Sequence, residues 1–155
     1  MIPPVVIHDG GEELLDSAGP LWLELFAHHC ARSERYAATH AGFDWPRRRQ
    51  LLLDKSSDGG SLRVSLAVDG EPVAYCFSTI DARGRGEVES LYVRATHRRL
   101  GLGGALVRRH LDWFRGVDRV VVGVAQGNEE AFAFYEALGF RVRVTVLEHL
   151  GEREP

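Results

Sequence analysis

The sequence has few cysteines and no long apolar run, and each of these two features excludes a class of protein. Its 155 residues include only two cysteines, Cys30 and Cys76, and no CxxC pair. That number is too small for a disulfide scaffold, so we expect a reduced, cytoplasmic protein. No apolar segment approaches the roughly 20 residues of a membrane-spanning helix, and the first residues lack the pattern of a signal peptide. We therefore expect no membrane association.

The chain also lacks a large excess of either charge, with 19 Lys and Arg residues against 22 Asp and Glu residues and a net charge of −3. Basic residues cluster only locally, around residues 47–49 and 94–99. Such a cluster on a slightly acidic chain favours binding of a small phosphorylated ligand over binding of a nucleic acid. The composition therefore predicts no nucleic-acid partner.

A metal site is not expected either. His28 and His29 are adjacent, so their side chains point about 100° apart on a helix. They lack the i, i+4 spacing and the accompanying carboxylate that a metal site favours.

The chain shows no internal repeat and no abrupt change of composition, so we expect one domain over residues 1–155. The patterns predict, in order, strand 4–9, helices 19–34 and 44–57, a hairpin over 61–81 that turns at Asp69-Gly70, strand 87–93, helix 101–115, buried strand 118–126, helix 128–139 and strand 140–150. Pro20 is expected in the first turn of its helix. This order predicts an α/β fold with a mixed, mostly antiparallel central sheet and about four flanking helices.

The strand over 87–93 has an irregular apolar pattern. Val88 and Leu91 are three residues apart, whereas a regular strand would place them at an even spacing. A β-bulge near Ser90 accounts for the extra residue, and bulges are frequent beside active sites. Glu87 and Glu89 remain on one face in this arrangement.

A glycine-rich turn joins this strand to the next helix. Gly101, Gly103 and Gly104 leave the first-turn amides of that helix open to a ligand, and unpaired amides together with the helix dipole bind anions. Arg98 and Arg99 add positive charge. The turn is not a Walker A loop, because no Gly-Lys-Ser/Thr follows, and it is a poor dinucleotide fingerprint. A flexible helix start without a ligand is the alternative interpretation.

Two segments resemble the signatures of the GNAT superfamily, the acetyl-CoA-dependent N-acetyltransferases. Arg98-Arg99-Leu100-Gly101-Leu102-Gly103 resembles its Arg/Gln-x-x-Gly-x-Gly/Ala motif, and the preceding 87–93 resembles its fourth strand. Residues 128–140 resemble its second signature, with Asn128 and Tyr135 seven apart and a closing Leu-Gly-Phe. The resemblance covers roughly residues 60–150, and the first 60 residues agree in element order only.

The resemblance implies a GNAT-like fold that binds acetyl-CoA as acyl donor. It places the pyrophosphate on 98–104, the pantetheine arm against the backbone of 91–93, and further contacts at Asn128 and Tyr135. The cofactor-binding residues that it implies are Leu91, Tyr92, Val93, Arg98, Arg99, Gly101, Leu102, Gly103, Gly104, Asn128 and Tyr135.

Acetyl transfer to an amine needs a base, an oxyanion donor and an acid for the leaving thiolate. Tyr135 is the expected acid, with a core aromatic as its structural alternative. The amide of Tyr92 or Val93 is the expected oxyanion donor. Glu87 and Glu89 are the candidate bases, with solvent as a third source and with plain solvent-facing carboxylates as the structural alternative.

These features predict an N-acetyltransferase in which a primary amine attacks acetyl-CoA directly in a ternary complex. The alternative is a non-catalytic acyl-CoA sensor with the same fold. The acceptor is expected to be a small-molecule amine or a protein amine, and the two glutamates favour a cationic one.

The acceptor side is expected to be lined by Phe26, Tyr36, Trp45 and one of His28 and His29. Many family members continue with a hairpin after the second signature, whereas here 140–150 is one alternating segment. The acceptor side is then open, or a partner chain completes it. The regular alternation favours pairing with another strand, so we expect a homodimer.

Overall fold

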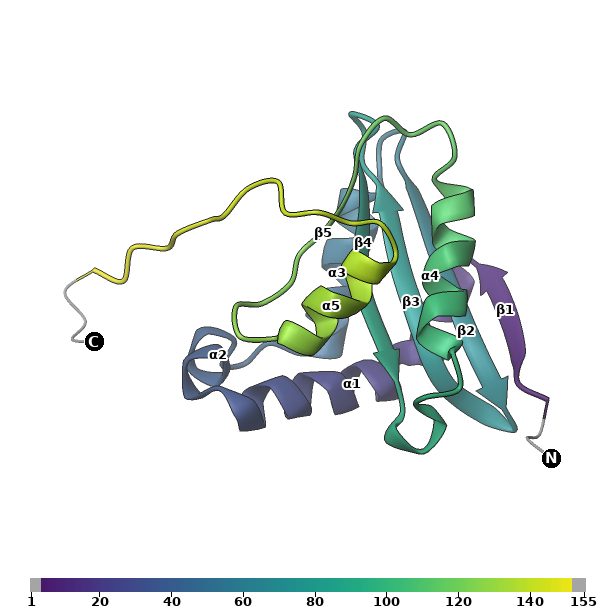
Figure 1. Cartoon of the computed structure of the whole chain (residues 1–155), viewed down its shortest axis with the longest axis horizontal. Helices are drawn as coiled ribbons and strands as arrows, with labels where there is room; N and C mark the ends of the chain where they lie inside the picture. The colour runs from purple at the N-terminus through teal and green to yellow at the C-terminus, as the bar shows by residue number, and fades with distance from the viewer. Residues whose placement is uncertain (1–3, 152–155) are drawn as a thin grey trace. The chain divides into compact units, whose positions relative to one another are not determined.

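The computed structural model describes residues 4–151, and the chain divides after Gly123 into two compact units that are described separately. The first unit holds a five-stranded sheet in the order β1-β2-β3-β4-β5 (Figure 1). Its strands are β1 (Val6–Gly10), β2 (Ser61–Asp69), β3 (Glu71–Ile80), β4 (Gly86–Val93) and β5 (Val120–Val122). Neighbours from β1 to β4 pair antiparallel, and β5 is parallel to β4. The mixed, mostly antiparallel sheet predicted from the sequence is confirmed.

Helices precede and interrupt these strands. The helical elements are η1 (Glu12–Leu14), α1 (Leu15–Arg32), α2 (Glu34–Thr39), α3 (Trp45–Lys55), η2 (Ala95–His97), α4 (Leu102–Trp113) and, in the second unit, α5 (Glu129–Ala137). Asp44 caps α3 by accepting a 3.0 Å hydrogen bond from the amide of Arg47, as its position before Pro46 predicts. The short helix α2, capped by Ser33, was not predicted.

The sheet of the first unit is covered on both faces. Side chains alternate along a strand, so Tyr75 and Phe77 of β3 point to the same face. They join Leu21 and Trp22 of α1 and Leu52 of α3 in the main apolar cluster. Ser65 and Ser78 point to the opposite face, where their hydroxyls contact the buried His110 of α4.

Two predicted details of the first unit are wrong. Helix α1 begins at Leu15, so Pro20 lies inside the helix instead of in its first turn. The 3₁₀ helix η1 leads directly into α1 and so moves the helix start earlier than the proline suggests. Strand β5 spans only Val120–Val122 and is half-buried, although its valine run predicted a longer buried strand.

The bulge in β4 is present. Phe77 of β3 lies opposite Ser90, whereas the next residue, Ser78, lies opposite Val88. Glu89 is therefore the extra residue, directly beside the position that the apolar spacing predicted. The bulge separates the part of β4 that pairs with β5 from the part that leads to the glycine turn.

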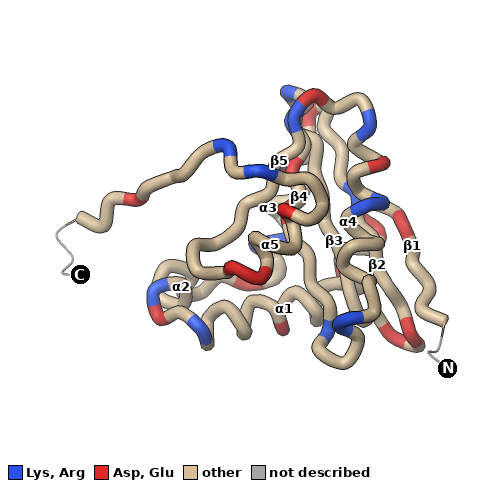
Figure 2. The backbone as a smooth tube through the Cα atoms, viewed as in Figure 1, with Lys and Arg blue, Asp and Glu red and all other residues tan. Residues whose placement is uncertain are grey.

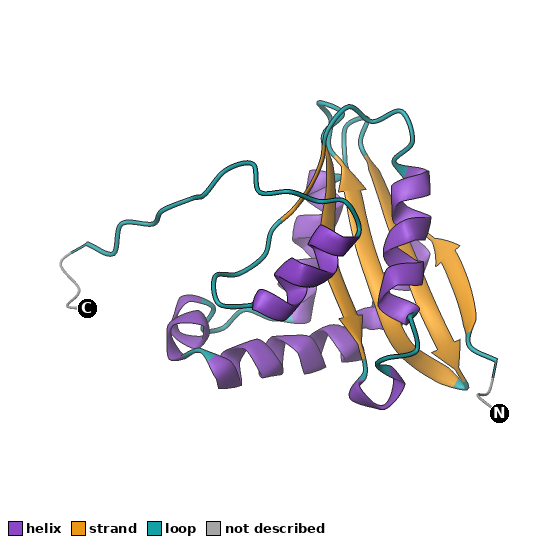
Figure 3. Ribbon diagram, viewed as in Figure 1, coloured by secondary structure: helices purple, strands orange, loops and turns teal. Residues whose placement is uncertain are grey.

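The second unit contains α5 and the segment that follows it. Asn128 caps α5 by accepting a 3.2 Å hydrogen bond from the amide of Ala131, and Gly139 ends the helical region with a φ of 97°. Residues 140–150 form no strand (Figure 3), so the strand predicted there is wrong. Alternation makes a segment suitable for a sheet, but a strand also needs a partner, and no described strand pairs with this segment.

None of the helices within residues 4–151 is long and apolar enough to cross a membrane. The single domain expected over residues 1–155 remains a prediction, and residues 1–3 and 152–155 of that range lie outside the described part of the chain.

Candidate active site

The turn between β4 and α4 has an unusual backbone. Gly101, the N-cap of α4, has a φ of 80°, and Arg99 has a φ of 64°. A positive φ is easy for glycine but uncommon for arginine. No described side chain caps α4, so the first-turn amides at residues 102–104 have neither a helical nor a side-chain partner. The turn therefore presents backbone donors at the positive end of a twelve-residue helix.

Positive charge gathers at the same turn (Figure 2). The Nε atom of Arg98 donates a 2.9 Å hydrogen bond to the carbonyl of Val93, and its guanidinium lies 5.7 Å from the ring centre of Tyr92. Arg98 and Arg99 are both exposed. Arg98 thus ties the glycine turn to the end of β4 while the surface of the turn stays basic.

Strand β4 has an open edge beyond its bulge. Strand β5 pairs with β4 only at residues 86–88, whereas β3 continues to pair with β4 as far as Val93. Among the strands that the structure describes, none lies against the outer edge of Leu91, Tyr92 and Val93. This edge can accept an extended ligand that forms backbone hydrogen bonds.

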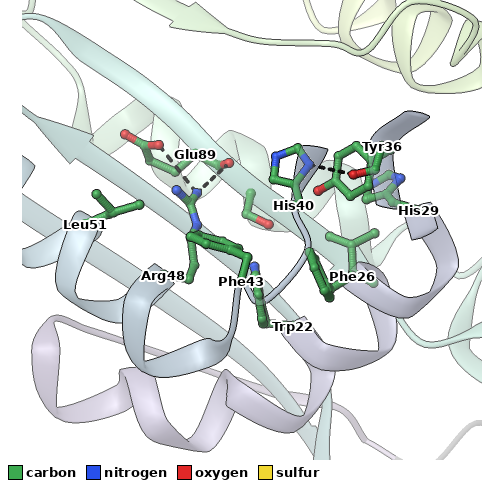
Figure 4. A pocket seen from close by; sticks show the side chains of 11 residues that line it. Trp22, Phe26, His29, Tyr36, His40, Phe43, Arg48, Leu51 and Glu89 are labelled. Atoms are coloured by element: carbon green, nitrogen blue, oxygen red, sulfur yellow. Dashed lines mark hydrogen bonds and ion pairs between the residues drawn. The ribbon is translucent and has the colours of Figure 1, made fainter. Parts of the chain in front are cut away.

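A pocket of about 410 Å³ opens beside the bulge in the first unit (Figure 4). Six rings line it: Trp22, Phe26, His29, Tyr36, His40 and Phe43. Leu25 and Leu51 add apolar surface, and Arg48, Glu89 and Ser90 are its remaining lining residues. The first three rings belong to α1, the next two to α2 and its C-terminal cap, and Phe43 to the loop before α3.

Phe26, His29 and Tyr36 are among the residues expected at an acceptor cleft, and all three line this pocket. Trp45 does not line it, and its indole instead donates a 3.3 Å hydrogen bond to Asp16. His28 is also absent from the lining, and its ring lies 3.3 Å from a guanidinium nitrogen of Arg32.

The two predicted carboxylates lie together and share one lysine. Nζ of Lys55 donates a 2.8 Å hydrogen bond to Glu87 and also forms an ion pair with Glu89. The hydroxyl of Thr79 donates a 2.7 Å hydrogen bond to Oε1 of Glu89, and Arg48 lies 3.5 Å from Oε2. Both oxygens of Glu89 therefore have partners.

These contacts set the pKa of Glu89. Burial alone raises the pKa, but hydrogen bonds from Lys55 and Thr79 and the charges of Lys55 and Arg48 outweigh it, so the pKa lies below its usual value. Burial also acts against charged Lys55, but the two glutamates raise its pKa overall. Glu87 and Glu89 were expected to favour a cationic acceptor, but their negative charges are already balanced by Lys55 and Arg48 of the protein itself.

Sequence reasoning missed the cations of this cluster. Lys55 ends α3 and belongs to no motif, and Arg48 was noticed only as part of a basic run. Lys55 of α3 and Glu87 of β4 are 32 positions apart in the chain, and no local sequence pattern indicates such a contact.

The remaining predicted site residues belong to the second unit. The ring of Tyr135 contacts Phe134 at 5.0 Å and Phe140 at 5.5 Å between ring centres. The side chain of Asn128 serves as the cap of α5. Their roles toward a cofactor remain predictions. Among residues 4–151, no cluster of three or more His, Cys, Asp or Glu side chains is placed to hold a metal ion.

Solved acetyltransferase structures share this fold. The PaiA N-acetyltransferase from Thermoplasma acidophilum, in complex with coenzyme A, is 18% identical, with a TM-score of 0.69 over 92% of this chain and 93% of its own. The ribosomal-protein-alanine N-acetyltransferase from Brucella melitensis biovar Abortus 2308 is 19% identical, with a TM-score of 0.63 over 96% and 100%. The aminoglycoside N-acetyltransferase AAC(6')-Iy, in complex with CoA, is 16% identical, with a TM-score of 0.67 over 99% and 100%.

The fold is therefore that of the N-acetyltransferases. The family model of the acetyltransferase (GNAT) family matches residues 22–140, which is most of the chain. The protein belongs to this family, which confirms both the family and the enzyme class that the two motifs predicted. The sequence has no significant match among curated proteins.

Proposed function

We propose that this chain transfers the acetyl group of acetyl-CoA to a primary amine, which attacks the thioester directly in a ternary complex. The observation that carries this proposal is that three features converge on β4. Its end leads into the uncapped turn of α4, its outer edge is open over residues 91–93, and its bulge residue Glu89 lines the pocket. One extended thioester along β4 could engage the turn and present its carbonyl to the pocket.

The turn and the strand edge would hold the donor. We assign the pyrophosphate to the first-turn amides of α4 with Arg98 and Arg99, because unpaired amides and a helix dipole favour an anion. The residues in this role are Arg98, Arg99, Gly101, Leu102, Gly103 and Gly104. Leu91, Tyr92 and Val93 would lie along the pantetheine arm, with hydrogen bonds from the backbone of Leu91 and Val93, and Asn128 would contact the cofactor. Structural neighbours in complex with coenzyme A support this assignment.

The chain would supply three chemical roles. The amide of Tyr92 or Val93 would stabilise the oxyanion. Val93 is the better candidate, because the amide of Arg94 donates to Val73 of β3 and successive amides of a strand point to opposite edges, so the amide of Val93 faces the open edge. The hydroxyl of Tyr135 would protonate the leaving thiolate. The incoming ammonium would give its proton to Glu87, through a water, or to solvent.

We favour Glu87 over Glu89 as base. A base must have an oxygen that can accept a proton, and both oxygens of Glu89 already have donors or cations. Its side chain is 6% exposed, against 25% for Glu87. Among the described residues, the cation nearest to Oε1 of Glu87 is Arg85, at 3.9 Å. Glu89 is therefore better suited to fixing Lys55 and Arg48 beside the pocket.

Replacing Tyr135 by Phe tests the enzyme against the non-catalytic acyl-CoA sensor. An enzyme that uses this hydroxyl as its acid should lose about 100-fold in kcat, while acetyl-CoA affinity stays nearly unchanged. Phe134→Leu, which alters a neighbouring ring on α5, is the matched control and should keep kcat. The measurement is amine-dependent release of free coenzyme A, with calorimetry for affinity. Tight acetyl-CoA binding without acetylation of any amine by the native protein would favour the sensor instead.

We also propose a cytoplasmic location and a homodimer. Both cysteines, Cys30 and Cys76, are free, which suits a reducing compartment. The alternating segment 140–150 supports self-association, because Val142, Val144 and Val146 are all strongly exposed.

A further inference from the structure

The walls of the pocket are formed by aromatic rings that pack against one another. Phe26 lies at the centre of this group, with Trp22 stacked on it at 5.1 Å between ring centres. Tyr36 and Phe43 each lie 6.1 Å from Phe26. Tyr36 in turn stacks on His40 at 4.1 Å. Three segments therefore contribute rings to one side of the pocket, whereas Arg48, Glu89 and Ser90 add polar groups to its lining (Figure 4).

No unpaired negative charge faces this pocket among the residues that line it. Glu89 is the only carboxylate in the lining, and it is held by Lys55, Thr79 and Arg48. Arg48 itself lines the pocket and adds positive charge. The pocket lining offers no free carboxylate to pair with the ammonium groups of a polyamine, so the pocket is poorly suited to a polycation.

The two histidines of the lining do not change this conclusion. Burial, together with the charges of His28, Arg32 and His40, lowers the pKa of His29, so its imidazole is neutral at neutral pH. Nδ1 of His40 lies 2.9 Å from the backbone carbonyl of Tyr36 and donates to it, because that carbonyl can only accept. Neither imidazole supplies the negative charge that a polycation would need.

We propose that the acceptor is a primary amine carried on an aromatic body, with its ring against the half-buried Phe26, Tyr36 and Phe43 and the amine toward Ser90 of the bulge. This proposal rests on the proposed function, because it names the acceptor of that reaction. The volume of about 410 Å³ is near the lower end of small-molecule sites, which suits one or two rings on a short chain. Aromatic walls favour such a ring over an alkyl chain, because ring pairs gain more than their buried area alone gives.

Binding of three amines tests this proposal without requiring turnover. The probes are 2-phenylethylamine, n-propylamine, which keeps the ammonium but lacks the ring, and spermidine, which carries several ammonium groups. Calorimetry measures each amine against the native protein, with and without saturating coenzyme A. We expect 2-phenylethylamine to bind at least about tenfold more tightly than n-propylamine, and spermidine to bind no better than n-propylamine.

Variants locate the binding in the pocket. Tyr36→Ala should remove most of the preference for the ring, and Tyr36→Phe should keep it. Phe43→Leu keeps an apolar side chain without a ring face and should lower the preference several-fold, which serves if Tyr36→Ala does not fold. Leu23→Ala is the control, because Leu23 is an exposed residue of α1 outside the pocket, and it should bind all three amines as the native protein does.

The results separate this proposal from the enzymatic one. If 2-phenylethylamine binds with the expected preference but no amine is acetylated, the pocket assignment holds and the proposed function fails. If amines are acetylated but n-propylamine or spermidine binds as well as 2-phenylethylamine, the aromatic acceptor is wrong and the proposed function stands. An unchanged preference in both Tyr36→Ala and Phe43→Leu would also overturn the pocket assignment.

Discussion

At the residue scale, Glu89 connects the bulge, the ion-pair cluster and the pocket. The bulge makes it the extra residue of β4, and its side chain, 6% exposed, contacts Lys55 and Arg48. A nearly buried carboxylate with two cations is costly to remove, because Arg48 then loses its ion-pair partner and Lys55 is left with Glu87 alone to balance its charge. Glu87 shares Lys55 but is more exposed, so its contribution to stability is smaller.

We expect Glu89→Gln and Glu87→Gln to affect different properties. Glu89→Gln should lower the free energy of unfolding by about 3 kcal/mol, whereas Glu87→Gln should cost less than about 1 kcal/mol. Glu87→Gln should instead lower kcat by about 100-fold if it is the base. Urea unfolding and steady-state kinetics measure the two effects. A Glu87→Gln variant with native kcat would assign the proton to solvent, and a Glu89→Gln variant of native stability would contradict the ion-pair account.

At the element scale, a buried polar chain anchors α4 to the sheet. Ser65 of β2 donates its hydroxyl proton to Asp9 of β1, so Nε2 of His110 must donate to Ser65 across 2.9 Å. Nδ1 of His110 lies 2.7 Å from the hydroxyl of Ser78, and a neutral imidazole accepts a hydrogen bond from this hydroxyl. Burial, aided by Arg63 and Arg109, lowers the pKa of His110 to about 4, and α4 is the helix that presents the glycine turn.

Stability should therefore depend on pH through His110. Its folded-state pKa of about 4 lies below the ordinary value of 6.5, so the unfolded chain binds the proton more readily. The stabilising effect is complete above pH 6.5 and is lost as the pH falls toward about 4. Between about pH 8 and about pH 5 the native protein should lose about 2 kcal/mol, measured by urea unfolding.

The variant His110→Gln should remove most of this pH dependence, whatever its own stability. His8→Gln is the matched control, because His8 is an exposed histidine of β1, and it should keep the native pH dependence. Equal pH dependence in the native protein and His110→Gln would show that His110 is not the titrating group.

Elements with strong local signals were predictable from the sequence. Each of these signals depends on one turn, one cap or one strand. They are the turn at Asp69-Gly70, the caps Asp44 and Asn128, and the β-bulge indicated by the odd spacing of Val88 and Leu91. The Lys55–Glu89 contact was not foreseen, and the ring-lined pocket was foreseen only in part. They depend on how α1, α2 and α3 pack on the sheet, which no local pattern encodes. The strand predicted over 140–150 shows the same limit, since alternation does not supply a partner.

At the scale of the whole molecule, residues 140–150 are the segment that most needs a partner. Val142, Val144 and Val146 alternate with polar residues and are 64%, 70% and 84% exposed. An extended apolar edge of this kind favours pairing with another strand. We therefore expect the native protein to sediment as a dimer at micromolar concentration.

A pair of substitutions tests this expectation. Val144→Asp should weaken the dimer at least tenfold, because a charge would enter the apolar face. Arg143→Asp, on the polar side of the same segment, should weaken it much less. A native protein that sediments as a monomer would contradict the dimer, and equal effects of both substitutions would move the interface elsewhere.

The central claim is that the turn before α4 holds the pyrophosphate of acetyl-CoA, and calorimetry of acetyl-CoA binding tests it most directly. The native protein should bind with micromolar affinity. Gly103→Glu, which places a carboxylate among the first-turn amides, should abolish binding, while Gly123→Ala, a glycine with ordinary φ and open space around it, should not. Binding to Gly103→Glu with native affinity, or no binding to the native protein, would contradict the assignment.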